Sequence, residues 1–309
     1  MDNSHTGNQL DNAFASIAFD TQGVPYIAYT YSNDPWIYNT VVVFKFDGTQ
    51  WVQVGGDVTA HGIVSEHALA INNENIPYII YSTASGDVVK KFNGEGWIQV
   101  GSAVDSHHSH PSKKISALPE VGISDLTLDS TGTPIVATAP SGPVIVSKLS
   151  NKTNQWKQLG DGGINGSGGL YSLALDAKGI PYIAYTNQSG YWRLHVVRLD
   201  TANNQWIQVG RGSALIFVQG DFLNITPSGA IFLMYSGEDY NPYDPYMSLA
   251  KTYNKKMNSW QTVGNQSPGN IGVSGYLNAS LAVNPKNNAP YLINTAINAS
   301  EDDEVLDLH

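Results

Sequence analysis

The chain has 309 residues, of which 41% are hydrophobic and only 14% are charged, so it can bury a large core and is not a disordered chain. Its net charge of −10 and isoelectric point near 5.1 argue against nucleic acids or anionic membranes as partners, because both require a basic surface. The absence of cysteine excludes disulfides, thiolate metal sites and cysteine nucleophiles.

The start of the chain lacks a targeting signal. Residues 1–8 contain neither a basic start nor an apolar run, so we expect no signal peptide in this chain. No segment approaches the roughly eighteen uninterrupted apolar residues of a membrane span. We therefore expect a soluble monomer without membrane insertion.

A strand begins each of several internal repeats. Residues 15–20, 67–72, 124–129 and 171–176 alternate apolar and small or polar side chains and end in Asp or Asn. This alternation predicts β-strands. The sequence Asp-x-x-Gly-x-Pro follows at residues 20–25, 129–134 and 176–181. Such a sequence predicts a tight turn, because Gly allows positive φ and Asp can accept bonds from turn amides.

The second strand starts with proline in the repeated sequence Pro-Tyr-Ile-Ala-Tyr or a close variant, at residues 25–29, 77–81, 181–185 and 290–294. Proline is tolerated at the first position of a strand. A third, valine-rich strand follows at residues 41–46, 88–92, 144–149 and 194–199. The pattern therefore predicts a meander of antiparallel strands.

The fourth strand carries the second half of the repeat, Trp-x-x-(Val/Leu)-Gly. It occurs five times, beginning at Trp51, Trp97, Trp156, Trp206 and Trp260. We expect each large ring to fill the same gap between neighbouring sheets, and we assign no ligand-binding role to these tryptophans.

Repeats of this kind predict an all-β fold, a six-bladed β-propeller of four-stranded antiparallel blades. We expect a single domain over residues 1–309, with blades starting near residues 14, 66, 123, 170, 220 and 278. The fifth unit lacks the usual hairpin sequence, and the sixth has no Trp-x-x-Val-Gly. Either the last blade is short, or residues 1–12 add an edge strand, or the chain is part of a longer protein.

The repeats resemble bacterial β-propeller repeats of the form Asp-x-x-Gly-x-Pro-Tyr-Ile-Ala-Tyr followed by Phe-(Asp/Asn)-Gly-x-x-Trp-x-x-Val-Gly. The resemblance covers nearly the whole chain. It implies a propeller fold and a secreted or cell-surface location. Because these residues build blades and that family is largely without assigned activity, the resemblance implies no catalytic residue.

A ligand surface is expected at one face of such a propeller. The first-to-second and third-to-fourth connections are short turns, whereas the second-to-third and blade-to-blade connections are long and variable. The second-to-third loops, which include residues 30–38, 187–192 and 237–246, combine aromatic residues with acids and amides. This combination suits sugar rings or a protein interface. The candidate ligand-binding residues are Trp36, Tyr38, Tyr191, Trp192, Tyr243 and Tyr246. Rigidifying the loops is the alternative role for these rings.

Two groups of residues are candidate metal ligands, although no cofactor is required. The longest blade-to-blade connection, residues 102–121, contains His107, His108 and His110, which could hold Zn²⁺, Cu²⁺ or Ni²⁺. Solvated histidines are the default alternative. A variable loop also contains Glu238, Asp239 and Asp244, whose carboxylates could bind Ca²⁺.

One set of residues could form a catalytic site near the propeller axis. The glycine-rich residues 162–169 lack the Gly-Lys-Ser/Thr ending of a P-loop and are expected to form a flexible connector. First-strand residues at the variable-loop face could converge near the axis, as in a hydrolase, or simply line a channel. This axial set consists of Glu66, His67, Asp125, Tyr171 and Asp221.

Three functions follow from these observations. The leading hypothesis is a non-enzymatic recognition scaffold that binds carbohydrate or protein through the variable-loop face. The second is an axial-site hydrolase or lyase assisted by a divalent metal. The third is a structural module of a larger assembly.

Overall fold

The structure is a computed structural model. It describes residues 15–34, 38–59, 67–83, 86–104, 124–138, 143–164, 171–187, 193–210, 213–214, 219–226, 228–237, 247–262, 279–283, 286, 290–298 and 303–308. These residues contain strands and turns but no helix, and so no helix that could cross a membrane.

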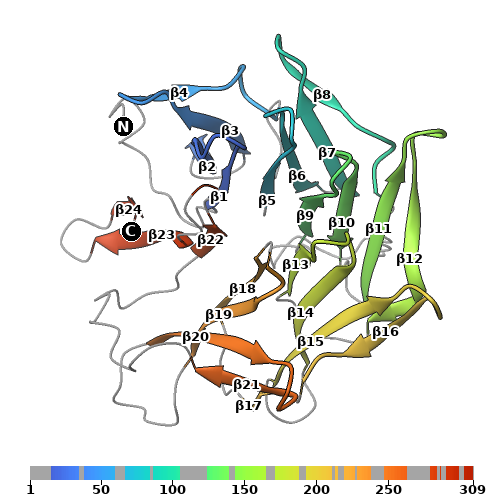
Figure 1. Cartoon of the computed structure of the whole chain (residues 1–309). Helices are drawn as coiled ribbons and strands as arrows, with labels where there is room; N and C mark the ends of the chain where they lie inside the picture. The colour runs from blue at the N-terminus through green and yellow to red at the C-terminus, as the bar shows by residue number, and fades with distance from the viewer. Residues whose placement is uncertain are drawn as a thin grey trace, which may run out of the picture.

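The described strands form six antiparallel sheets (Figure 1). Sheet 1 contains β1 (Ala15–Phe19), β2 (Pro25–Asp34), β3 (Tyr38–Phe46) and β4 (Trp51–Gln53). Sheet 2 contains β5 (His67–Ile71), β6 (Pro77–Thr83), β7 (Gly86–Phe92) and β8 (Trp97–Gln99). Sheet 3 contains β9 (Ser124–Leu128), β10 (Pro134–Thr138), β11 (Val144–Ser150) and β12 (Gln155–Ile164).

The remaining sheets follow the same order. Sheet 4 contains β13 (Tyr171–Leu175), β14 (Pro181–Asn187), β15 (Arg193–Asp200) and β16 (Gln205–Gln208), with β17 (Ser213–Ala214) paired to β15. Sheet 5 contains β18 (Gln219–Ile225), β19 (Ile231–Gly237), β20 (Met247–Asn254) and β21 (Ser259–Thr262). Sheet 6 contains β22 (Ala279–Val283), β23 (Pro290–Asn298) and β24 (Asp303–Leu308).

The sheets fan around a common centre, with each first strand innermost (Figure 1). The first strands contact one another in chain order, from β1 through β5, β9, β13 and β18 to β22, and β1 also contacts β22. The fold is therefore all-β and propeller-like. The first strands of the six sheets begin at residues 15, 67, 124, 171, 219 and 279.

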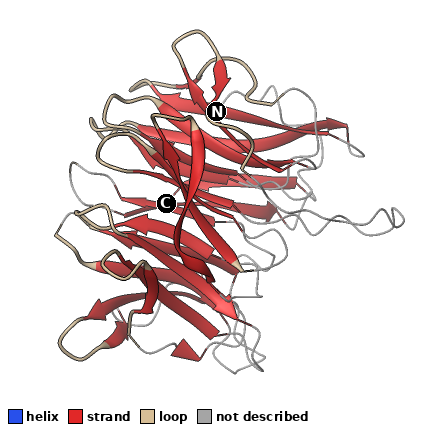
Figure 2. Ribbon diagram, turned by 90° about the vertical axis from the view of Figure 1, so that its right-hand side faces the viewer, coloured by secondary structure: helices blue, strands red, loops and turns tan. Residues whose placement is uncertain are grey.

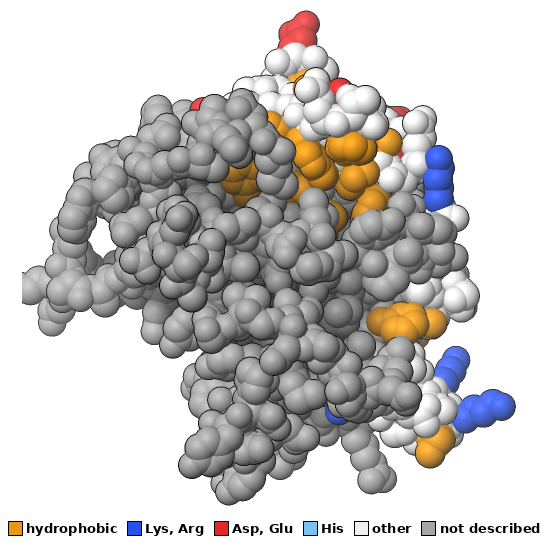
Figure 3. Space-filling view, turned by 90° about the vertical axis from the view of Figure 1, so that its left-hand side faces the viewer, with side chains coloured by type: hydrophobic (Ala, Val, Ile, Leu, Met, Phe, Trp, Pro, Cys, Tyr) orange, Lys and Arg blue, Asp and Glu red, His pale blue; other side chains and the backbone are white. Residues whose placement is uncertain are grey.

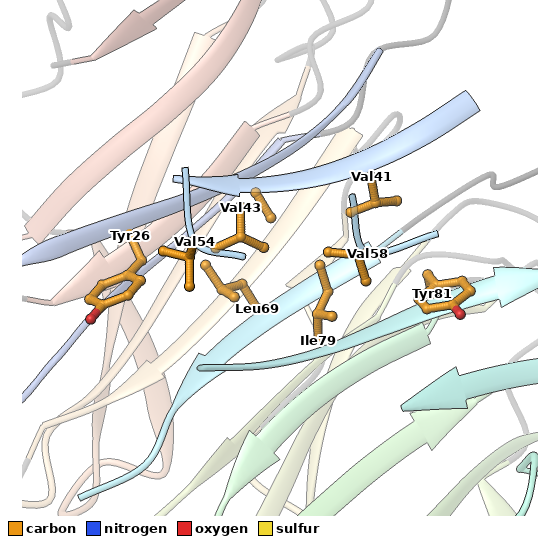
Figure 4. Close-up of a cluster of buried hydrophobic side chains, with 9 residues drawn as sticks. Tyr26, Val41, Val43, Val54, Val58, Leu69, Ile79 and Tyr81 are labelled. Atoms are coloured by element: carbon orange, nitrogen blue, oxygen red, sulfur yellow. The ribbon is translucent and has the colours of Figure 1, made fainter. Parts of the chain in front are cut away.

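The core lies between neighbouring sheets. Between sheets 1 and 2, Val43 and Val58 from one sheet pack with Leu69 and Ile79 from the other (Figure 4). Equivalent apolar clusters fill the spaces between sheets 2 and 3, 3 and 4, and 4 and 5. Sheets 2, 3 and 4 are therefore covered on both sides, so apolar residues on both of their faces are buried.

The other face of sheet 1 is also apolar. Ile17 and Ile27 are buried there, and Phe19, Tyr29 and Trp51 pack against them. Figure 3 views the side of the molecule where sheets 1 and 6 lie and shows hydrophobic side chains gathered at the level of sheet 1.

The repeated tryptophans contact the preceding sheet, as the sequence predicts. A Cβ added to Gly55 would lie 3.2 Å from Nε1 of Trp97, and one added to Gly210 would lie 2.9 Å from Nε1 of Trp260. Gly101 and Gly160 approach Trp156 and Trp206 in the same way. The glycine that ends one repeat thus makes room for the tryptophan of the next.

One expectation about an irregular segment is wrong. The glycine-rich connector predicted from residue 162 begins inside β12, where Ile164 pairs with Val144 across a register shift. The fifth unit keeps a hairpin despite its unusual sequence. In its turn, the Ala230 amide donates to Oγ1 of Thr226 at 3.1 Å, so threonine replaces the usual aspartate.

Candidate functional site

The first-to-second connections form one face of the molecule, where described turns gather (left in Figure 2). In the first turn, Oδ1 of Asp20 accepts hydrogen bonds from the Gln22 and Val24 amides, both at 2.8 Å. Asn72, Asp129 and Asp176 close their turns in the same way. The turns at Asp20, Asp129 and Asp176 are those that Asp-x-x-Gly-x-Pro predicts, and the Asn72 turn forms without that sequence.

Neighbouring turns on this face also bond to one another. Oδ1 of Asn75 accepts from the amide and hydroxyl of Thr21 at 3.1 and 2.8 Å. The Asn73 amide group donates to the Ser130 carbonyl at 3.0 Å. Many polar groups of the turn face therefore hold the sheets together, which favours the opposite face for ligand binding.

The opposite rim contains the ends of the second-to-third hairpins. The predicted loop from Thr30 to Tyr38 is mostly strand instead: β2 continues to Asp34, and β3 begins at Tyr38. Asp34 pairs with Tyr38, and a register shift separates this pair from Ser32. Sheet 1 thus presents an extended hairpin, and Tyr38 lies at its end.

The second-to-third connection of sheet 2 is short, contrary to expectation. Thr83 pairs with Gly86, leaving only residues 84 and 85 between the two strands. The Thr83 hydroxyl donates to the Gly86 carbonyl at 2.7 Å. The hairpin ends of the rim therefore differ in length, because sheet 1 extends further than sheet 2.

The other aromatic candidates lie outside the described residues, although their flanking strands are described. These candidates are Trp36, Tyr191, Trp192, Tyr243 and Tyr246. Asn187 pairs with Arg193 at the end of β14 and β15, and Gly237 pairs with Met247 at the end of β19 and β20. In the sequence, each candidate thus stands between the second and third strands of its sheet.

The candidate metal ligands also fall outside the described residues: His107, His108, His110, Glu238, Asp239 and Asp244. Within the described ranges, no three His, Asp or Glu side chains lie close enough to hold a metal ion.

The axial set is not brought together where the structure describes it. Glu66 lies outside the described residues, and only the backbones of Tyr171 and Asp221 are described. His67 lies between sheets 1 and 2, where Nδ1 is 3.1 Å from the Ser16 hydroxyl. This is the spacing of a base and a nucleophile, but both side chains are buried, at 8% and 7% exposure. The pair therefore joins two sheets.

Asp125 lies between sheets 3 and 4. Its Oδ2 accepts the Leu173 amide at 2.6 Å, and its Oδ1 accepts the Leu126 amide at 2.7 Å. Burial raises the pKa of Asp125 to about 6, although bonds from Leu173, Leu126 and Ser172 act in the opposite direction. Asp125 thus caps amides of two innermost strands.

The same capping recurs at the next interface. The Leu223 amide donates to the Ser172 hydroxyl at 3.1 Å, and Ser172 stands in β13 where Asp125 stands in β9. In β5 the equivalent residue is Ala68, whose side chain cannot accept a bond from the Leu126 amide of the next sheet. Asp125 of the same strand accepts that bond instead. His67 and Asp125 therefore serve different sheet interfaces.

A second buried acid, Asp87, is not among the candidates named from the sequence. The Ser82 hydroxyl donates to Oδ1 of Asp87 at 2.6 Å and lies 3.0 Å from the Ser124 hydroxyl of sheet 3. Burial raises the pKa of Asp87 to about 6, and the Ser82 bond opposes this shift. One sequence signal existed: the equivalent third-strand positions hold Val41 and Leu194.

Lys90 is another polar residue between sheets. Its Nζ donates to the Val58 carbonyl of sheet 1 and lies 5.7 Å from the centre of the Tyr81 ring. Burial lowers the pKa of Lys90 and raises that of Tyr81. A carbonyl and an aromatic face both attract the ammonium group, so Lys90 joins sheets 1 and 2.

No protein-family model matches the chain, and no curated protein matches its sequence. Several solved structures share its fold. A protein of unknown function from Dyadobacter fermentans has a TM-score of 0.65 at 12% identity, covering 95% of this chain and 92% of that one. Trypanosoma rangeli sialidase has a TM-score of 0.57 at 14% identity, covering 96% of this chain and 54% of the sialidase.

A further similar structure is a mutant of AofleA from Arthrobotrys oligospora in which three arginines are replaced by alanine. It has a TM-score of 0.62 at 10% identity, covering 97% of this chain and 84% of that one. These likenesses show the fold alone. This chain spans about half the length of the sialidase but nearly all of the first structure.

Proposed function

We propose that the chain is a six-bladed β-propeller whose sixth blade is the shortest. The support is the cyclic order of contacts, because β1 contacts β22 as the other first strands contact their neighbours. The apolar second face of sheet 1, with Ile17 and Ile27, needs a covering sheet as the other faces do. In this arrangement each blade corresponds to one of the six sheets.

On this scaffold we infer a recognition protein without enzymatic activity, which binds carbohydrate or protein at the hairpin rim. The observation that carries this inference is the contrast between faces. On the face formed by the first-to-second turns, polar side chains bond to neighbouring turns, as Thr21 does to Asn75. The hairpin rim instead receives Tyr38 and the ends of the aromatic-rich hairpins of sheets 4 and 5. Aromatic rings beside acids and amides suit sugar C–H faces and protein anchors.

Carbohydrate is the first ligand class to test. One protein of similar fold is named a sialidase, an enzyme that acts on a sugar, although the likeness carries no residue over. An axial hydrolase has less support in this chain. His67 and Asp125, two of its five candidate residues, are hydrogen-bonded between different pairs of sheets.

The test is a glycan array combined with pull-down of protein partners. Wild type is compared with Trp36→Ala, Tyr38→Ala and Trp192→Ala, and with Met257→Ala as a control. Met257 is 65% exposed and lies in the third-to-fourth turn of sheet 5, away from the hairpin rim. We expect at least one rim variant to lose binding about tenfold or more, with binding retained in the control. A hydrolase activity in a substrate screen, with no ligand in either assay, would refute the proposal.

A further inference from the structure

Asp87 holds both ends of one blade-to-blade connection. Its main-chain carbonyl accepts the Val104 amide at 2.9 Å, and the two residues form an isolated β-bridge. Its carboxylate accepts the Ser82 hydroxyl, which in turn contacts the hydroxyl of Ser124, the first residue of β9. Val104 and Ser124 flank residues 105–123. One residue thus reaches the start and, through Ser82, the finish of that connection.

A carboxylate at this position distinguishes sheet 2 from its neighbours. Strand pairing places Asp87 opposite Ser82, just as Val41 lies opposite Thr30 and Leu194 lies opposite Thr186. Asp87 is only 2% exposed. Valine occupies the same position in sheet 1 and leucine occupies it in sheet 4, so the fold itself does not require an acid there.

The hydrogen bond between Ser82 and Asp87 can reverse, whereas the two bonds from backbone amides to Asp125 cannot. The carboxylate of Asp125 receives amide N–H groups, which can only donate. Asp87 instead bonds to the hydroxyl of Ser82, which also contacts the hydroxyl of Ser124, and a hydroxyl can donate or accept. A protonated Asp87 can therefore donate to Ser82 without leaving a buried donor unpaired.

We propose that Asp87 is a proton-sensitive anchor that holds both ends of the 105–123 connection more firmly in its neutral form. The connection joins the fourth strand of sheet 2 to the first strand of sheet 3, and the residues that flank it, Val104 and Ser124, lie on the side of the second-to-third hairpins. Any effect of this anchor on ligand binding at the hairpin rim rests on the proposed function. The anchor itself does not, because it can be measured without a ligand.

The direction of the effect follows from burial. The pKa of Asp87 is raised from 3.8 to about 6 in the fold, first by burial and despite the Ser82 bond. A raised carboxyl pKa means that stability is highest below the unfolded value and is lost as the pH rises through the folded value. The anchor should therefore weaken between about pH 4 and pH 6 and stay weak above that range.

Few described groups can obscure this titration. On the same face of sheet 2, Tyr78 and Lys91 form a pair four residues further along the strands. On β9, Asp125 bonds to the opposite neighbour, sheet 4. The imidazoles of His107, His108 and His110 in the connection also titrate near this range, so they need their own control.

The experiment is hydrogen–deuterium exchange of the ligand-free protein at pH 5.0 and 7.5, corrected for intrinsic exchange rates. We expect about tenfold more frequent opening at pH 7.5 at the amides of Val104 and of the start of β9. Asp87→Asn should remove this pH dependence while keeping a neutral hydrogen-bonding group. Asp87→Val introduces the side chain that Val41 has at this position in sheet 1, and should also give pH-independent protection.

Two results would contradict the proposed role of Asp87. One is pH-independent protection in the wild type. The other is an unchanged pH dependence in Asp87→Asn that disappears when His107, His108 and His110 are all replaced by glutamine. If the anchor is confirmed but no ligand is found, only the proposed function fails.

Discussion

Trp206 of sheet 4 packs directly against Gly160 of sheet 3. A Cβ on Gly160 would collide with Nε1 of the indole, and the Gly160 backbone has a φ of 80°. The Gly160 amide also donates to Oδ1 of Asn204 in the neighbouring sheet at 3.2 Å. This contact explains why tryptophan and glycine recur together: the glycine of one repeat accommodates the ring of the next.

Gly160→Ala should therefore destabilise the protein strongly. Gly162→Ala is a matched control, because Gly162 has a similar φ of 74° but no atom within 4 Å of an added Cβ. We expect a loss of about 1–2 kcal/mol for the control from backbone strain alone, and about 1–3 kcal/mol more for Gly160→Ala from overpacking. Urea unfolding measures both values. Equal losses would show that the indole contact adds nothing.

The local part of this fold is predictable from sequence. Alternating apolar residues, Asp-x-x-Gly-x-Pro and strand-initial proline each act within a few residues, so the strands and first turns are as expected. The tryptophans could be assigned to the gaps between sheets because they repeat. Their partner glycines could not be assigned, because Trp206 and Gly160 meet only when two sheets are side by side.

Asp125→Ala should cost about 2–5 kcal/mol, because the buried amides of Leu126 and Leu173 both lose their acceptor. Asp125→Ser should recover part of this loss, since Ser172 serves the equivalent role at the next interface. The comparison uses urea unfolding at pH 7 with the two variants and wild type. Wild-type stability in Asp125→Ala would contradict a capping role.

Asp129 should make the protein sensitive to acid. Burial acts to raise its pKa, but Lys148, Thr131 and Thr133 outweigh burial and lower the pKa to about 2. A lowered carboxyl pKa means that its stabilisation is present above about pH 4 and is lost as the pH falls toward 2. Lys148 is 41% exposed, so water screens the ion pair and we expect a contribution of only about 1 kcal/mol.

Thermal unfolding of wild type and Asp129→Asn between pH 5 and pH 2 measures this contribution. The wild type should lose its advantage over the variant as the pH falls. Parallel curves across that range would show that Asp129 contributes no pH-dependent stability.

Asn75 should tolerate glycine better than alanine. It occupies the left-handed turn position, with a φ of 62°, where the first turn has Gly23 with a φ of 77°. Asn75→Gly keeps this backbone free of strain and loses only the exposed bonds to Thr21, so we expect a change within about 1 kcal/mol. Asn75→Ala should cost about 1–2 kcal/mol more. Unfolding midpoints that rank alanine above glycine would contradict this assignment.

The candidate site was less predictable than the fold. Residues 30–38 contain Asn, Asp and Pro and were expected to form a loop, yet Asp34 pairs with Tyr38 in an extended hairpin. Pairing depends on the facing strand, which composition does not reveal. For the same reason the sequence could not show that His67 bonds Ser16 or that Ser82 contacts Ser124, since these contacts join different repeats.

A crystal structure of the full chain tests the central claim most directly. We expect β1 to lie beside β22, with six sheets around one axis and with Tyr38 and the hairpin ends of sheets 4 and 5 on one rim. Two stacked layers of sheets, or an open superhelix with β1 far from β22, would contradict the ring and scatter the proposed binding rim.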